Sequence, residues 1–87
     1  MQDLKNTQFF RIEKEQEIQV SDVLSQVYQA MAEKGYNPVS QIVGYILSED
    51  PTYITTHNNA RNLMRRIDRF ELLQILLRDY LRSGMDS

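Results

Sequence analysis

The side chains most often used in catalysis are scarce in this sequence. There is no Cys, and the single His, His57, stands in a polar stretch without a local motif for nucleophilic catalysis. The three glycines are isolated from one another, so no glycine-rich phosphate-binding loop is present. Glu49 and Asp50 form an acidic pair, but Asp directly before Pro51 is more typical of a helix N-cap than of a metal ligand. The sequence therefore predicts no catalytic site, no metal and no cofactor.

Arginine is the most concentrated group that could bind a ligand. Arg61, Arg65 and Arg69 follow one another at four-residue steps, and Arg66 lies beside them. In a continuous helix this spacing would place three guanidinium groups on one face, where they could bind a phosphate through paired hydrogen bonds. The alternative is a solvated face whose arginines pair with nearby acidic residues. Both interpretations stay open at this point.

A candidate phosphate acceptor lies near the N-terminus. Thr7 belongs to a polar stretch, residues 1–17, which we predict to be a flexible, extended arm. A phosphate on Thr7 would add about −1.5 to −2 charges and three acceptor oxygens. Arg11 and the four arginines between 61 and 69 are the candidate docking residues for that phosphate. Three other threonines are rival phosphate acceptors: Thr52, Thr55 and Thr56. Their positions are also those of residues that cap helices and turns, which accounts for them without phosphorylation.

Tyrosines mark a candidate protein interface. Tyr36, Tyr45 and Tyr53 lie in the segment of the chain with the fewest charges. Aromatic anchors with few charges around them are typical of the centre of an interface, although core packing is the ordinary explanation. Gly44 lies in the middle of a predicted helix, where glycine costs about 1 kcal/mol relative to alanine. We therefore expect another backbone to approach closely at Gly44, either across a dimer interface or within one subunit.

The elements that would carry these residues are helices. Apolar residues recur at three- and four-residue steps, Gly35 is typical of a helix end, and Asn37-Pro38 and Asp50-Pro51 are typical helix starts. Asp68 and Glu71 have the spacing of a capping box, which indicates a break near 67–69. The predicted helical segments cover about 20–34, 38–48, 51–54, 59–67 and 69–82.

Length and composition limit the architecture. The chain has 87 residues, of which 41% are hydrophobic. We predict an all-α fold, a compact bundle of four or five short helices over 18–82 with a frayed C-terminus over 83–87. A domain of this size buries only about 60–65% of its unfolded surface, so we expect it to gain burial by forming a homodimer.

Charge and hydropathy bear on location and partners. No apolar run approaches the ~18 residues of a membrane span, and the first residues do not resemble a secretory leader, so we expect a cytoplasmic protein without membrane insertion. The net charge is −2, which argues against nucleic-acid binding. Residues 58–82 carry six Arg against three acids, however, so a helix-turn-helix regulator that uses the Arg61–Arg69 segment is the alternative function.

One long stretch points to a family. Residues 34–48 read KGYNPVSQIVGYILS, and Asp50-Pro51 and the NARN of 59–62 follow at fixed spacing. This pattern resembles the IreB regulatory phosphoprotein family, small cytoplasmic proteins of low-GC Gram-positive bacteria. The resemblance implies a helical homodimer without enzymatic activity, phosphorylated on an N-terminal Thr by a transmembrane Ser/Thr kinase with extracellular PASTA repeats. It also implies a phosphatase for that kinase's product, an unidentified downstream protein, and a negative regulatory role in cell-envelope stress and β-lactam tolerance.

The sequence departs from the family pattern at two positions. Family members can carry two Thr near the N-terminus; Thr7 matches the second of these positions, whereas Leu4 stands at the first. Leu4 cannot accept a phosphate, so Thr7 is the acceptor that the resemblance implies here. Glu49 stands where the family usually has Gly. We expect this exchange to stiffen the turn or alter the cap without changing the fold.

Overall fold

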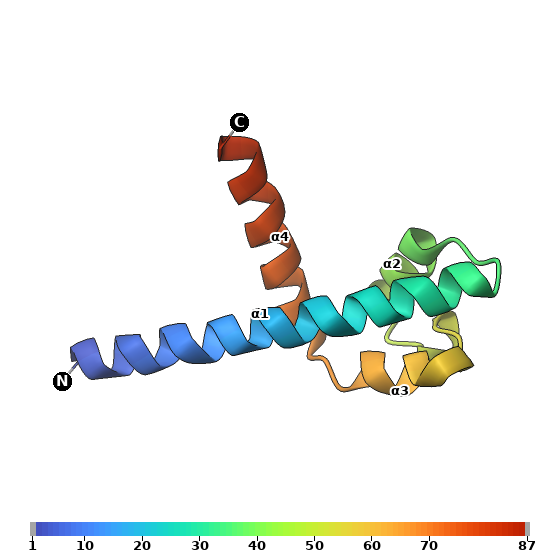
Figure 1. Cartoon of the computed structure of the whole chain (residues 1–87), viewed down its shortest axis with the longest axis horizontal. Helices are drawn as coiled ribbons and strands as arrows, with labels where there is room; N and C mark the ends of the chain where they lie inside the picture. The colour runs from blue at the N-terminus through green and yellow to red at the C-terminus, as the bar shows by residue number, and fades with distance from the viewer. Residues whose placement is uncertain (1, 87) are drawn as a thin grey trace.

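One long helix, α1 (Gln2–Glu33), forms the axis along which the other elements are arranged (Figure 1). The computed structural model describes the backbone of residues 2–86 and the side chains of residues 14–84. Across the described backbone the structure is helical and has no strand, which confirms the predicted all-α class. The remaining elements are α2 (Pro38–Ser48), the 3-10 turns η1 (Pro51–Tyr53) and η2 (His57–Asn59), α3 (Ala60–Arg65) and α4 (Arg69–Asp86).

The C-terminus of α1 ends as the sequence predicts. Gly35 adopts a φ of 83°, in the left-handed region where glycine has no steric penalty. The Gly35 N–H donates to the carbonyl of Ala32 at 3.0 Å, and the Tyr36 N–H donates to that of Met31 at 3.0 Å. These two bonds form a Schellman motif, which satisfies carbonyls that a helix end would otherwise leave without donors.

The N-terminus of α1 differs from the prediction. The sequence predicts an extended arm over residues 1–17 and a first helix from about 20, but the backbone of residues 2–17 is helical and continuous with the rest of α1. Residues 13–19 are all Glu, Lys, Gln or Ile, without Pro or Gly, and Glu, Lys and Gln have high helix propensity. Once packing holds residues 20–31 in a helix, propagation toward the N-terminus costs little. The mobility predicted for residues 1–17 stays a prediction.

Both Pro-containing helix starts are confirmed. Asn37 is the N-cap of α2, where its Oδ1 accepts the N–H of Ser40 at 3.1 Å and Pro38 follows at the first helical position. Asp50 caps η1 in the same way, because its Oδ1 accepts the N–H of Thr52 at 3.0 Å. Each cap supplies an acceptor for an amide that has no partner inside its own helix.

The core lies between α1 and the elements from α2 to α3. α1 contributes one apolar stripe at three- and four-residue steps, and this stripe packs against α3 and α2. The most deeply buried large side chains are less than 2% exposed: Val27, Met31, Ile54, Met64 and Leu72. The full buried set adds smaller or slightly more exposed side chains: Val20, Val23, Ala30, Tyr45, Ile46, Ala60 and Ile67.

The last helix projects from the body of the molecule, formed by the packed elements from α1 to α3, instead of packing along it. The chain breaks its helical path at residues 66–68, as predicted, and the Glu71 N–H donates to Asp68 Oδ2 at 3.0 Å in the expected cap. α4 then projects away from α1 and continues to Asp86, past the predicted end near Gly84 (Figure 1). The radius of gyration is 14.7 Å, whereas a compact domain of this length would have about 12 Å. The projecting α4 and the N-terminal half of α1 account for the difference.

Candidate interaction surface

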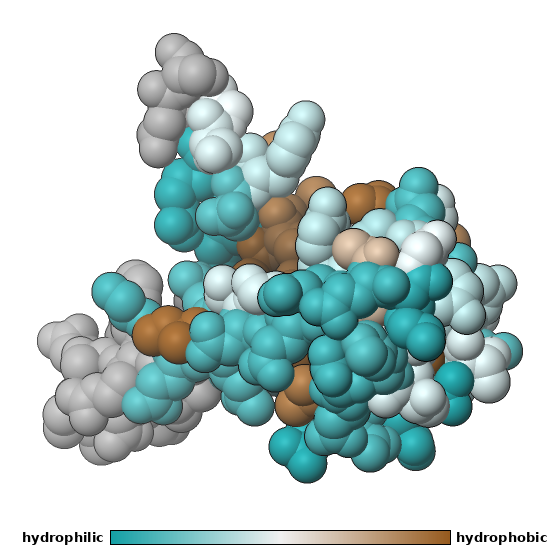
Figure 2. Space-filling model, turned by 45° about the vertical axis from the view of Figure 1, so that its right-hand side comes forward, coloured by the Kyte–Doolittle hydropathy of each residue, from teal (hydrophilic) through white to brown (hydrophobic). Residues whose placement is uncertain are grey.

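A groove of about 910 Å³ lies between α1 and α4. Its walls are residues 17–32 of α1 and residues 75–82 of α4, and its apolar lining consists of Ile18, Val20, Leu24, Tyr28, Ala32, Ile75 and Leu76. Charged side chains also line it: Glu17, Asp22, Arg78, Asp79 and Arg82. Figure 2 shows apolar surface gathered where the column formed by α4 meets the body of the molecule. An apolar lining with charges alongside is typical of surfaces that bind protein.

The groove is bridged by an ion pair. Arg78 Nη1 lies 3.2 Å from Glu17 Oε2, and both side chains are about one-third exposed, at 34% and 36%. A pair with this much contact with solvent contributes about 0–1 kcal/mol to stability. The pair therefore orients α4 against α1 more than it stabilises the fold.

α4 carries a second apolar face that points away from the groove. Leu72 is buried against the body, whereas Phe70, Leu77 and Tyr80 are 69%, 57% and 76% exposed. Leu73 and Leu81 are exposed as well, so the exposed set recurs at the three- and four-residue steps of one helical face. A helix that is apolar on two faces is normally buried on both. In a single chain, the outer face of α4 is left to solvent.

The predicted arginine face is interrupted. α3 ends at Arg65 and α4 begins at Arg69, so the break at 66–68 separates the positions that a continuous helix would have aligned. Arg61 Nε donates to the carbonyl of Ile54 at 2.9 Å, and Arg69 Nη1 donates to that of Ile46 at 2.6 Å. Two of the four guanidinium groups thus hold backbone carbonyls in place. Arg65 and Arg66 are exposed.

The tyrosine candidates separate into core and surface. Tyr45 is buried at 6% exposure, whereas Tyr36 is half exposed and Tyr53 is 38% exposed. Gly44 has a close neighbour, but the nearest atoms belong to a side chain and not to the backbone that the sequence predicts: a Cβ at Gly44 would overlap the ring of Tyr53. This approach lies within one chain, between α2 and η1.

A family model describes most of the chain. The model for the IreB regulatory phosphoprotein matches residues 5–82. The chain belongs to the IreB regulatory phosphoprotein family. Three relatives are UPF0297 proteins. The one from Lachnoclostridium phytofermentans is 57% identical over 81 residues, covering 93% of this chain and 92% of the relative. The one from Ruminiclostridium cellulolyticum is 49% identical over 80 residues, covering 92% and 91%, and the one from Acetivibrio thermocellus is 55% identical over 75 residues, covering 86% and 83%.

The resemblance to the IreB family is thus confirmed, and a regulatory role follows from it at the level of the family. The helix-turn-helix alternative is not supported. That motif joins two helices through a turn of about 3–4 residues, whereas two 3-10 turns separate α2 from α3 in this member of the family. Among the helices that the structure describes, none combines the length and the apolar character needed to span a bilayer.

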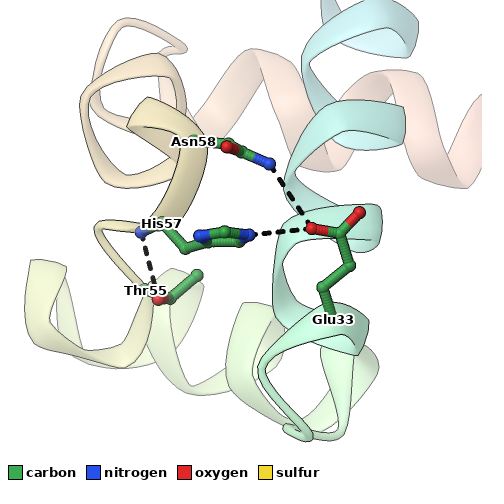
Figure 3. Close-up of polar contacts among 4 residues, drawn as sticks. All are labelled: Glu33, Thr55, His57 and Asn58. Atoms are coloured by element: carbon green, nitrogen blue, oxygen red, sulfur yellow. Dashed lines mark hydrogen bonds and ion pairs between the residues drawn. The ribbon is translucent and has the colours of Figure 1, made fainter.

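His57 of this IreB-family chain fastens two elements together (Figure 3). Its Nε2 lies 2.8 Å from Glu33 Oε1 at the end of α1, and its backbone N–H donates to Thr55 Oγ1 at 3.2 Å. Asn58 Nδ2 reaches the same Glu33 oxygen at 3.5 Å. Asn58 and Asn59 both have positive φ, 54° and 63°, in the left-handed region that Asn tolerates better than most residues. The geometry around His57 is that of a turn held against a helix end.

Acidic side chains in the described region also serve local structure. The hydroxyl of Thr52 donates to Asp50 Oδ1 at 2.7 Å, and this bond together with the Thr52 N–H holds the pKa of Asp50 below its ordinary value of 3.8. Within residues 14–84, no group of three His, Asp or Glu side chains is placed to hold a metal ion. The side chains of Thr7 and Arg11 lie outside the described ones, so their predicted roles rest on the sequence.

Sequence reasoning missed the groove and the contact between Glu49 and Arg69. Arg69 Nη2 lies 2.5 Å from Glu49 Oε2, which joins the start of α4 to the end of α2. The spacing of Leu and Tyr in residues 70–81 did indicate a wide apolar face on α4. No local sequence pattern predicts the direction in which α4 projects, because that direction depends on contacts between residues about twenty positions apart.

Proposed function

We propose that this chain is a non-catalytic regulatory phosphoprotein that acts by binding other proteins, under the control of a Ser/Thr kinase and its phosphatase. The observation that carries the proposal is the pair of exposed apolar surfaces, the α1–α4 groove and the outer face of α4. Monomeric soluble proteins rarely expose large contiguous apolar patches without a binding role. The family description, a regulatory phosphoprotein, supports the same conclusion.

Self-association is part of this proposal. The outer face of α4 offers Leu73, Leu77, Tyr80 and Leu81 on one side of an 18-residue helix. Pairing with the same helix of a second copy would cover these side chains, and two-fold pairing places identical apolar rows against one another. The groove would remain available to a downstream protein, whose identity is open.

Phosphorylation of Thr7 is the proposed control. Thr7 lies on α1, the same helix that forms one wall of the groove. Arg11 lies one helical turn further along, and a phosphate at i and an arginine at i+4 attract one another on a helix. Arg65 and Arg66 are the exposed members of the arginine group, so they are the remaining docking residues proposed for the phosphate. The proposal places the protein in the cytoplasm, the side of the membrane on which a receptor kinase with extracellular repeats has its catalytic domain.

The test is phosphate mapping on the protein taken from its own growing cells. We expect one phosphate, localised to Thr7 by peptide mass spectrometry, and its loss in Thr7→Ala but not in Thr52→Ala. The second part compares growth of the two variant strains in the presence of a β-lactam. A change of tolerance in Thr7→Ala alone supports the regulatory role. Phosphate confined to Thr52, Thr55 or Thr56 would refute Thr7 as the control site, and the absence of phosphate with and without envelope stress would refute kinase control altogether.

A further inference from the structure

Glu49 holds an unusual backbone conformation. It is the C-cap of α2, with φ 64° and ψ 13°, and its N–H donates to the carbonyl of Tyr45 at 2.8 Å. This left-handed conformation places Cβ close to the following carbonyl, so it favours Gly and is unfavourable for a side chain such as Glu. An unfavourable conformation of this kind persists when the surrounding contacts hold it in place.

The contact that holds Glu49 comes from the first residue of α4. One guanidinium nitrogen of Arg69 pairs with the Glu49 carboxylate at 2.5 Å, and another donates to the carbonyl of Ile46 at 2.6 Å. Arg69 thus binds an acidic side chain and a free carbonyl at the C-terminus of α2, where the helix dipole also attracts a positive charge. A Gly at position 49 would relieve the backbone but would remove the carboxylate.

Besides Arg69, α4 contacts the rest of the chain through Leu72, Ile75 and Arg78. Leu72 anchors its first turn in the core, and the Glu17–Arg78 pair touches α1 further along. The linker of residues 66–68 is not helical, so it can accommodate different directions of the helix that follows. Ile75 and Arg78 line the groove and face α1, whereas Arg69 attaches the base of α4 to the end of α2, so it constrains the helix from a second direction.

We propose that Glu49 and Arg69 form a latch that sets the angle at which α4 leaves the body and so keeps the α1–α4 groove open. Glu49 acts in this proposal as a positioning residue. Its side chain is 70% exposed, so the pair contributes little to folding stability and its effect falls on orientation. The proposal deepens the proposed function, because the angle of α4 shapes the groove that the function uses, but the angle itself can be measured without any partner.

The experiment measures the distance between α1 and α4 by pulsed electron spin resonance. Because the sequence has no Cys, the double substitution Gln26→Cys and Ser83→Cys places spin labels at two exposed sites only. The labelled chain is diluted in an excess of unlabelled protein, so that distances within one chain dominate even if copies associate. We expect a narrow distance distribution with Glu49 in place and a broader one in both Glu49→Gln and Glu49→Gly.

Urea unfolding of the same variants separates loosening of α4 from loss of the fold. Glu49→Gly relieves the left-handed backbone, so we expect its unfolding midpoint to move to higher urea although its distance distribution broadens. Glu49→Gln keeps the unfavourable backbone and loses the charge, so it should broaden the distribution without that gain. The matched control is Glu33→Gln, which removes an acidic partner of similar type from His57 and touches η2 instead of α4.

Three results would overturn the latch. The first is an unchanged distance distribution in Glu49→Gln or Glu49→Gly. The second is equal broadening in Glu33→Gln, which would show general loosening of the molecule. The third is insensitivity to salt: in about 1 M NaCl the screening length of about 3 Å is comparable to the separation of this exposed pair, so the distribution of the wild-type chain should broaden toward that of Glu49→Gln. If no phosphate is found at Thr7, the proposed function is refuted as regards its control site, whereas the distance measurements test the latch independently of that result.

Discussion

Replacing Gly44 with alanine tests how α2 and η1 pack against one another. Two opposing effects act at this position. Alanine in a helix interior is favoured over glycine by about 1 kcal/mol. In the native structure, however, the new Cβ would overlap the ring of Tyr53, so the ring must leave its place against α2. Overpacking of this kind typically costs about 1–3 kcal/mol. We therefore expect Gly44→Ala to lower the free energy of unfolding by up to about 2 kcal/mol.

The sign of the effect should reverse when the ring is removed. In a Tyr53→Ala background the atoms that Cβ would overlap are absent, and the helix preference for alanine remains. Gly44→Ala should then raise the free energy of unfolding by about 1 kcal/mol relative to Tyr53→Ala alone. The hydrogen bond from Gln41 Nε2 to Tyr53, 3.0 Å long, uses the backbone carbonyl of Tyr53 and is kept in both backgrounds.

The assay is urea unfolding followed by circular dichroism for the four chains of this double-mutant cycle. All four are compared at one protein concentration, because association would shift the midpoints. If Gly44→Ala destabilised both backgrounds equally, the reasoning from the Tyr53 ring would be refuted. A stabilising effect in the wild-type background would refute it as well, since the ring would then move aside without cost.

Two further predictions address the exposed helix and the capped turn. Leu77→Glu, which puts a charge on the outer face of α4, should convert the proposed dimer into a monomer in sedimentation velocity, whereas the control Leu47→Glu, at an exposed leucine of α2, should leave the mass unchanged; a dimer in both variants contradicts pairing through this face. Because the pKa of Asp50 is lowered in the folded chain, its capping bonds favour folding at pH above its ordinary value of 3.8, and this contribution is lost as the pH falls through the lowered pKa. Thr52→Val removes the hydroxyl donor and should raise that pKa in an NMR titration, and an unchanged midpoint would show that the hydroxyl is not the cause.

Local signals in the sequence predicted the helix ends well. Asn37-Pro38, Asp50-Pro51 and Gly35 each determine the conformation of a few neighbouring residues, so the caps of α2 and η1 and the end of α1 are where the pattern places them. The N-terminal half of α1 was missed because it lacks the apolar periodicity that marks a packed helix, and only propensity favours helix there.

Local sequence patterns could not predict contacts between residues that are far apart in the chain. Gly44 predicted the close approach of another backbone, whereas the Tyr53 ring lies there, because η1 folds back over α2. The pairing of Glu49 with Arg69 depends on the path of the whole segment between α2 and α4. The candidate phosphate-docking arginines show the same limit: their spacing was visible, but the use of Arg61 and Arg69 on backbone carbonyls was not.

The unbroken length of α1 restricts how a modification at Thr7 can be sensed. Residue 7 precedes the first groove residue, Glu17, by ten positions of one helix, which corresponds to about 15 Å along its axis. Electrostatic forces between exposed charges fade over about 8 Å at physiological ionic strength. A phosphate on Thr7 therefore exerts almost no field on the groove. Its effect on the groove therefore requires direct contact, either through docking of the phosphate on Arg65 and Arg66 or through a partner long enough to bind the phosphate and the groove at once.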